Sequence, residues 1–305
     1  MWLITHASGL EHDTGRMHPE NINRLPAIEK ALAAPEFEAL TRVDAERASH
    51  EEIGRVHDPE YVQRILDLIP ASGQTAIDGD TIVSAGSGEA ALRAAGGARQ
   101  AVDAVLTGQT RRAFCALRPP GHHAEPNQAM GFCLFNNVAI GAAHARAAHG
   151  LERVAIVDFD VHHGNGTQAM FRGREGYFYG STHQSPLFPG TGRRSENIPG
   201  NLCNVPLPDG TGSEVFREHF RDEIMAEVQA FNPQLILISA GFDAHARDPL
   251  AGMELTEGDF AWATAELVAA ADDCCQGRIV SVLEGGYDLE ALAASTAAHV
   301  RALLD

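Results

Sequence analysis

Residues 157–167 read Val-Asp-Phe-Asp-Val-His-His-Gly-Asn-Gly-Thr, and they continue an almost wholly apolar, β-branched run at 153–157. Such a run predicts a strand that is buried on both faces of a parallel sheet. Open α/β sheets bind their ligands at the carboxyl ends of the strands. Because side chains alternate along extended backbone, we expect Asp158, Asp160 and His162 on one side. Asp160 and His162 can then bind a single divalent cation.

The remainder of the chain alternates between apolar runs and segments with helical spacing. Further buried strands are predicted at 113–117, 235–238 and 279–283, and other strands at 2–4 and 177–179. Helices are predicted at 24–33, 51–56, 59–68, 92–105, 134–149, 213–231, 260–271 and 289–304. The Ser-, Gly- and Asp-rich segment 71–80 is expected to be a loop. No linker or repeat divides residues 1–305, which predicts one α/β domain with a mostly parallel central sheet flanked by helices.

Composition excludes several classes of protein. The formal net charge of -18 argues against direct nucleic-acid binding through phosphates. Neither a membrane span nor a secretory signal is expected, because no long apolar run is present. The five cysteines form no C-x-x-C pair, so we expect no disulfide framework and a cytoplasmic protein. The fifteen histidines occur in motifs, which suggests metal or acid–base chemistry.

Asp243 is the third candidate metal ligand. It follows the predicted strand at 235–238, so a parallel sheet would bring it to the same edge as Asp160 and His162. Three protein ligands leave one position open for water, as a catalytic zinc site requires. Taken alone, Asp243 is equally consistent with a helix cap or a turn.

Two adjacent histidines, His122 and His123, follow the stiff Pro-Pro-Gly segment 119–121. Each ring needs polar partners, so such a pair fits a hydrophobic core poorly, and a surface or metal-binding pair is the alternative to catalysis. Asp158 and Asn165 are candidate acceptors, one for each ring. A carboxylate favours imidazolium and a neutral amide does not, so we expect the two basicities to differ. His163 is expected to be structural.

Tyr287 follows two glycines, where a mobile loop could bring its phenol over the metal. A phenol directed at a developing oxyanion accelerates acyl transfer. Taken alone, a tyrosine beside two glycines is more often an ordinary loop residue.

Together these segments resemble the histone deacetylase superfamily, zinc-dependent amidohydrolases with the arginase–deacetylase fold. The matching motifs follow the family's order from His18-Pro-Glu20 onward: Arg118-Pro-Pro-Gly-His-His123, Gly131-Phe-Cys133, Asp158-Phe-Asp-Val-His-His-Gly-Asn-Gly166, Phe188-Pro-Gly-Thr-Gly192, Gly241-Phe-Asp243, Asp248-Pro-Leu250 and Glu284-Gly-Gly-Tyr287. Asn165, where other branches carry Asp, is similar to the class II branch and its bacterial amidohydrolase relatives.

The resemblance implies a role for each candidate residue. It implies one catalytic Zn2+ held by Asp160, His162 and Asp243. It assigns catalytic roles to His123 as general base and then acid, His122 as its neighbour, Asp158 and Asn165 as their partners, and Tyr287. It places around the substrate Asp80, Gly131, Phe132, Phe188 and Leu250. It also implies a structural K+ at Asp158, Asp160 and Ser181.

These roles imply that zinc-activated water removes acetyl or other acyl groups from N-acyl-lysine side chains, with formation of a homo-oligomer left open. The alternative substrate is an acetylated polyamine or another small acylamine. Leu250 stands where one polyamine-selective branch has Glu, whereas the negative net charge favours a cationic substrate. A two-metal arginase-type hydrolase would need further bridging carboxylates. A non-enzymatic acyl-lysine reader would not need the complete catalytic set.

Overall fold

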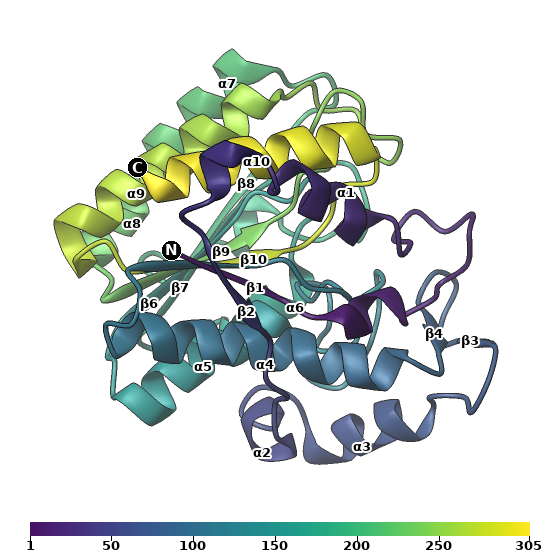
Figure 1. Cartoon of the computed structure of the whole chain (residues 1–305). Helices are drawn as coiled ribbons and strands as arrows, with labels where there is room; N and C mark the ends of the chain where they lie inside the picture. Colours follow the sequence, from purple (N-terminus) through teal and green to yellow (C-terminus); the bar gives the residue numbers. More distant parts are fainter.

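Eight parallel strands form the central sheet of the computed structural model, which describes all 305 residues (Figure 1). Their order is β2-β1-β5-β10-β9-β6-β7-β8, and every neighbouring pair is parallel. The strands are β1 Trp2–Thr5, β2 Thr41–Asp44, β5 Arg112–Cys115, β6 Val154–Asp158, β7 Tyr177–Gln184, β8 Leu202–Leu207, β9 Leu235–Ala240 and β10 Ile279–Leu283. The predicted parallel α/β fold is therefore confirmed.

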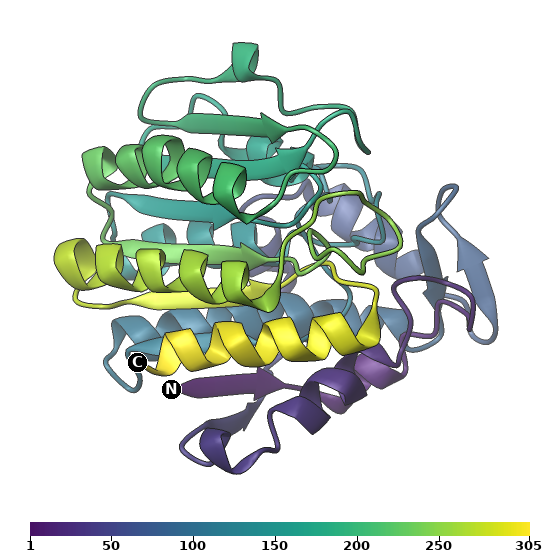
Figure 2. The ribbon, with the colours of Figure 1, turned by 90° about the horizontal axis from the view of Figure 1, so that it is seen from above.

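Helices cover both faces of this sheet (Figures 1 and 2). One layer contains α1 Arg24–Ala31, α7 Ser213–His219, α8 Ala226–Phe231, α9 Glu257–Cys275 and α10 Leu289–Leu304. The other contains α2 His50–Ile53, α3 Pro59–Asp67, α4 Ser87–Leu106, α5 Asn137–His149 and α6 Asn165–Phe171. Along β9, Ile236 and Ile238 pack against the first layer, and Leu235 and Leu237 against the second. Because both faces are buried, this strand is apolar from Leu235 to Ile238.

The sequence failed to predict four strands that lack a long apolar run. The segment 71–80 was predicted to be a loop, but β3 Gln74–Ala76 lies within it and pairs antiparallel with β4 Ile82–Ser84. This prediction was wrong because β3 is polar and largely exposed. The strands β2 and β8 lie at the two edges of the main sheet, where one side makes no ladder. Pro206 within β8 is tolerated for that reason.

Other boundaries shift slightly. The helix expected at 213–231 consists of α7, a π-helical turn at Phe220–Met225 and α8. The helix expected from residue 134 begins at Asn137, because the Asn136 side chain caps it by accepting the N–H of Ala139. None of the helices combines the length and hydropathy that a membrane span requires.

The carboxyl ends of all eight main strands lie at one edge of the sheet, towards which the arrowheads in Figure 2 point. Four neighbouring strands, β5, β10, β9 and β6, carry the loops that contain the predicted metal-binding and catalytic residues. Residues about 165 positions apart in the sequence are thereby brought together, as expected for a parallel sheet.

Candidate active site

The structure brings the three predicted metal ligands together in a buried cluster that we call the metal set: Asp160, His162 and Asp243. The first two follow β6, and Asp243 follows the neighbouring strand β9. His162 Nδ1 lies 3.0 Å from Asp160 Oδ1 and 3.1 Å from Asp243 Oδ2. One imidazole nitrogen and two carboxylate oxygens therefore converge, all within 4.8 Å of one another.

Main-chain N–H groups hold the remaining carboxylate oxygens of the metal set. Gly285 N donates to Asp160 Oδ2 at 2.8 Å, and Val161 N donates to Asp243 Oδ1 at 2.9 Å. A side chain at Gly285 would collide with both carboxylates. Each carboxylate is thus left with one oxygen directed towards His162.

The chemistry of this cluster suits a divalent cation. No lysine or arginine pairs with Asp160 or Asp243, whose ion pairs involve histidines alone. Burial raises the pKa of Asp243, and the charge of Asp160 raises it further. For His162, burial opposes the charged form, but hydrogen bonds to both carboxylates outweigh it and raise the pKa to about 10. Two buried carboxylates and one imidazole fit a zinc ion well.

A second cluster of this composition lies on the helices α4 and α5. His144 Nε2 and His149 Nε2 lie 2.7 and 2.6 Å from Asp103 Oδ1. Here, however, Arg99 donates to Asp103 Oδ2 at 3.1 Å, and Arg55 Nη1 lies 2.6 Å from His144 Nδ1. The guanidinium at Nδ1 leaves the proton of neutral His144 on Nε2, which then donates to Asp103 and cannot bind a metal. The two arginines thus already supply the positive charge that a metal ion would bring to this cluster.

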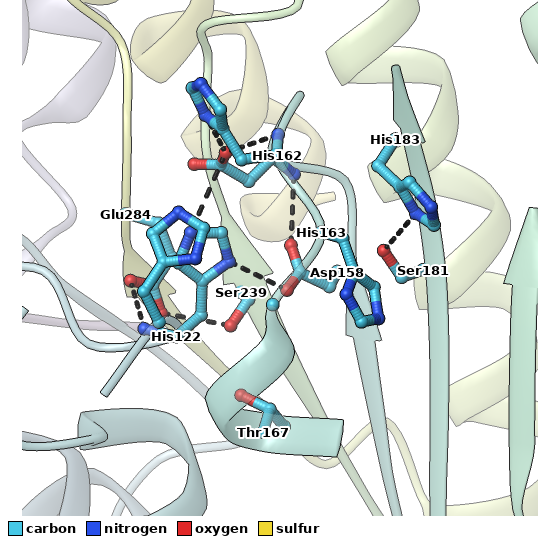
Figure 3. Close-up of polar contacts among 12 residues, drawn as sticks. His122, Asp158, His162, His163, Thr167, Ser181, His183, Ser239 and Glu284 are labelled. Carbon is cyan, nitrogen blue, oxygen red and sulfur yellow. Dashed lines mark hydrogen bonds and ion pairs between the residues drawn. The ribbon is translucent and has the colours of Figure 1, made fainter. Parts of the chain in front are cut away.

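Each histidine of the catalytic pair has the hydrogen-bond partner expected from the sequence. His122 Nδ1 lies 3.0 Å from Asp158 Oδ2 (Figure 3), and His123 Nδ1 lies 2.8 Å from Asn165 Oδ1. Asn165 Nδ2 donates to Glu125 Oε1 at 2.8 Å, which fixes the orientation of the amide. His123 must therefore donate from Nδ1, and its Nε2 lone pair is free to act as a base.

The two histidines of the pair differ in basicity in the expected direction. Burial lowers the pKa of His123 well below its usual value, and the charges of His122 and His162 lower it further. Burial also opposes the charge of His122, but Asp160 and Asp158 outweigh it and raise the pKa of His122 well above its usual value. At neutral pH the pair therefore consists of one imidazolium, His122, and one neutral imidazole, His123.

The substitution Asn165→Asp should reverse this tuning at His123. A carboxylate beside Nδ1 favours imidazolium, so the pKa of His123 rises. At a given pH a larger fraction of His123 is then protonated and unable to act as a base. We expect the acidic limb of the kcat/KM profile to move upward by about one pH unit, with activity retained best at alkaline pH. An unmoved limb, or one displaced to lower pH, would contradict the assignment of that limb to His123.

A cavity of about 240 Å³ reaches His162 of the metal set. It is lined by Asp80, His123, Gly131, Phe132, His162, Leu187, Phe188, Leu250 and Tyr287. All five residues predicted to surround the substrate are among them, as is Tyr287. Leu187 was missed because an isolated leucine beside proline carries no signal in the sequence.

Phe132 adopts an uncommon backbone conformation in the wall of this cavity. Its φ is 68°, in the left-handed region that aromatic residues rarely adopt. Such strain persists only where neighbours enforce it. The His18 ring packs against the Phe132 ring with centroids 4.7 Å apart, and Tyr287 contacts it at 5.8 Å. His18 Nε2 also lies 2.9 Å from the Asp80 carbonyl oxygen, a contact that only the tertiary structure reveals.

The loop that carries Tyr287 is anchored. Asp248 Oδ2 accepts the N–H of Tyr287 at 2.8 Å, and Asp248 Oδ1 accepts the N–H of Leu250 at 3.0 Å. Burial raises the pKa of the Tyr287 phenol well above its usual value, and the charges of Asp243 and Asp160 add to this. The phenol therefore stays protonated and can donate a hydrogen bond at neutral pH.

Ser181 and His163 lie on the side of Asp158 (Figure 3) and do not belong to the metal set. Ser181 on β7 is in register with Asp158 on β6, and its Oγ lies 2.9 Å from His183 Nδ1. His163 Nδ1 lies 2.8 Å from Thr191 Oγ1. The structural K+ stays a prediction.

The fold and this site together define a class: a parallel α/β protein with a candidate metal-binding cluster and a histidine pair at the carboxyl edge of its sheet. The model of the histone deacetylase domain matches residues 18–303. Histone deacetylase 14, chloroplastic, of Arabidopsis thaliana is 41% identical, and the match covers 99% of this chain and 76% of that protein. A probable deacetylase of Archaeoglobus fulgidus is also 41% identical, over 94% of this chain and 81% of its own.

A bacterial relative and a solved structure agree with these matches. The histone deacetylase-like amidohydrolase of Pseudomonas aeruginosa is 43% identical, over 79% of this chain and 64% of that protein. The crystal structure of the HDA15 HD domain superposes with a TM-score of 0.92 at 34% identity, covering 99% of this chain and 88% of that one. The chain therefore belongs to the histone deacetylase family, and the resemblance inferred from its motifs is confirmed.

Proposed function

We propose that this protein is a zinc-dependent hydrolase that removes acetyl groups from N-acyl-lysine side chains. One observation carries the proposal: His162 of the metal set, His123 and Tyr287 all line one cavity, whose walls include the aromatic rings of Phe132 and Phe188. Phe132 and Phe188 offer apolar faces that suit the methylene stem of an acyl-lysine. The family and its deacetylase and amidohydrolase relatives support the same chemistry.

The residues of the site would divide the proton chemistry between them. A zinc ion held by the metal set would supply Lewis-acid polarisation of the amide carbonyl and acidify a water molecule. Neutral His123 would accept a proton at Nε2 and then pass it to the leaving amine. His122, held as imidazolium by Asp158, would keep His123 weakly basic and so ready to release that proton. Tyr287 would donate a hydrogen bond to the developing oxyanion.

Removing one ligand of the metal set should abolish zinc binding and turnover together. Asp160→Ala deletes one of the two carboxylates, and the remaining pair holds zinc too weakly for a catalytic site. We expect zinc content near zero by elemental analysis and no measurable acetate release from an acetyl-lysine peptide. Turnover that persists without bound metal would sink the proposed mechanism. More than one metal per active site in the wild-type protein would instead favour two-metal hydrolysis.

An acetylated polyamine is the second candidate substrate, favoured by the net charge of -18 and by Asp80 in the lining of the cavity. Leu250, which offers no charge to a distal ammonium group, favours acyl-lysine. The two are separated by the kcat/KM values of acetyl-lysine peptides, acetylspermidine and acetylputrescine. If kcat/KM for both acetylpolyamines exceeds kcat/KM for every peptide, a small acylamine replaces acyl-lysine as the proposed substrate.

A further inference from the structure

Glu284 is a fully buried carboxyl group to which the proposed chemistry gives no role. Its Oε2 accepts the main-chain N–H groups of Gly121 at 2.7 Å and His122 at 3.1 Å. Its Oε1 accepts a hydrogen bond from Ser239 Oγ at 3.0 Å (Figure 3). Burying a carboxyl group is costly unless hydrogen bonds compensate. Here three donors, themselves buried, point at this one group.

The position of Glu284 in the sheet explains how one side chain contacts Gly121, His122 and Ser239. It follows the last residue of β10, which lies between β5 and β9. His122 belongs to the segment after β5, and Ser239 belongs to β9, so the side chain connects both neighbouring strands. The next residue, Gly285, donates its N–H to Asp160 of the metal set at 2.8 Å. Two consecutive residues therefore contact both the histidine pair and the metal set.

We propose that Glu284 is a positioning residue: its hydrogen bonds to the main chain of Gly121 and His122, together with its bond to Ser239, fix the segment that carries His122 and His123 relative to the metal set. The inference rests on the proposed function, because it concerns the placement of the general base in that reaction. Glu284 does not line the cavity, so it would act only through the histidines. A misplacement of about 1 Å can cost about 100-fold in rate.

The variants Glu284→Ala and Glu284→Gln separate hydrogen bonding from mere bulk. A glutamine oxygen can still accept from Gly121 and His122, and its NH2 group can donate to Ser239 Oγ. For Glu284→Ala we expect kcat per zinc-loaded molecule to fall by about 10- to 100-fold, with a much smaller change in KM. We expect Glu284→Gln to retain most of kcat. Ser239→Ala, which keeps both main-chain contacts, should lose less than Glu284→Ala.

Amide hydrogen exchange gives a readout that needs no substrate. In Glu284→Ala the amides of Gly121 and His122 should exchange faster, whereas Glu284→Gln should protect them. A residue needed only for folding would change Tm and the yield of zinc-loaded protein, but not the kcat of that fraction. Unchanged exchange in Glu284→Ala, or equal loss of kcat in both variants, would overturn the proposal. If the wild type releases no acetate while exchange responds as expected, the proposed reaction fails and the positioning stands.

Discussion

His123→Ala should lower kcat for an acetyl-lysine peptide by about 10²–10⁴-fold, the usual contribution of a general acid–base residue. The reason is geometric and electrostatic. His123 is the ring whose Nε2 lone pair is free at the cavity, because Asn165 holds its Nδ1–H at 2.8 Å. Burial keeps its pKa low, so at neutral pH the ring is neutral and able to accept a proton. Steady-state kinetics on zinc-loaded protein measures the loss.

A suitable control is His299→Ala, which also removes a buried imidazole. His299 lies in the core, with Nδ1 2.6 Å from Thr264 Oγ1 and Nε2 2.8 Å from Ser281 Oγ, and it does not line the cavity. This variant should lower Tm but leave kcat close to that of the wild type. If both variants lose kcat equally, loss of packing rather than loss of the base explains the effect. Full zinc occupancy in His123→Ala would exclude loss of metal as the cause.

The site was largely predictable because its residues follow long apolar strands. Short runs such as 235–238 and 279–283, which are apolar or nearly so on both faces, are typical of buried parallel strands, and parallel strands bring their carboxyl ends to one edge. That the two histidines differ in basicity followed from partner chemistry, since a carboxylate and an amide affect imidazole differently, whereas the roles of His122 and His123 followed from the resemblance. These inferences use charge and chain direction, both of which are written in the sequence.

What the sequence did not predict depends on packing between distant segments. The short strands β3 and β4 and the edge strands β2 and β8 lack the long apolar runs that mark central strands. The contact of His18 with Phe132 joins residues more than a hundred positions apart. Glu284 belongs to a motif quoted for the resemblance, yet its hydrogen bonds to Gly121 and His122 exist only because β10 lies beside β5.

Arg118→Ala should lower the free energy of unfolding by about 3–5 kcal/mol, the usual cost of removing one partner from a buried ion pair. Arg118 and Glu20 are both fully buried, and Arg118 Nη2 donates to Glu20 Oε2 at 2.7 Å. Arg118 Nη1 also donates to the Gly9 carbonyl oxygen at 2.5 Å. Truncation leaves the Glu20 carboxylate in the core with Arg24 as its remaining arginine partner, at 3.0 Å. Urea unfolding at neutral pH measures the difference.

The matched control is Arg301→Ala, which breaks the pair between Arg301 and Glu36, both about half exposed. Surface pairs of this kind contribute less than about 1 kcal/mol.

The pH dependence of the free energy of unfolding gives a second check. Burial alone would raise the pKa of Glu20, but Arg118 and its hydrogen-bond partners hold it well below its usual value. Ionised Glu20 therefore stabilises the fold above its unfolded-state pKa, and this contribution disappears as the pH falls through the lower folded-state value. In Arg118→Ala the free energy of unfolding should depend less on pH. If Arg118→Ala and Arg301→Ala lower the free energy of unfolding equally, the buried pair stabilises the fold no more than a surface pair.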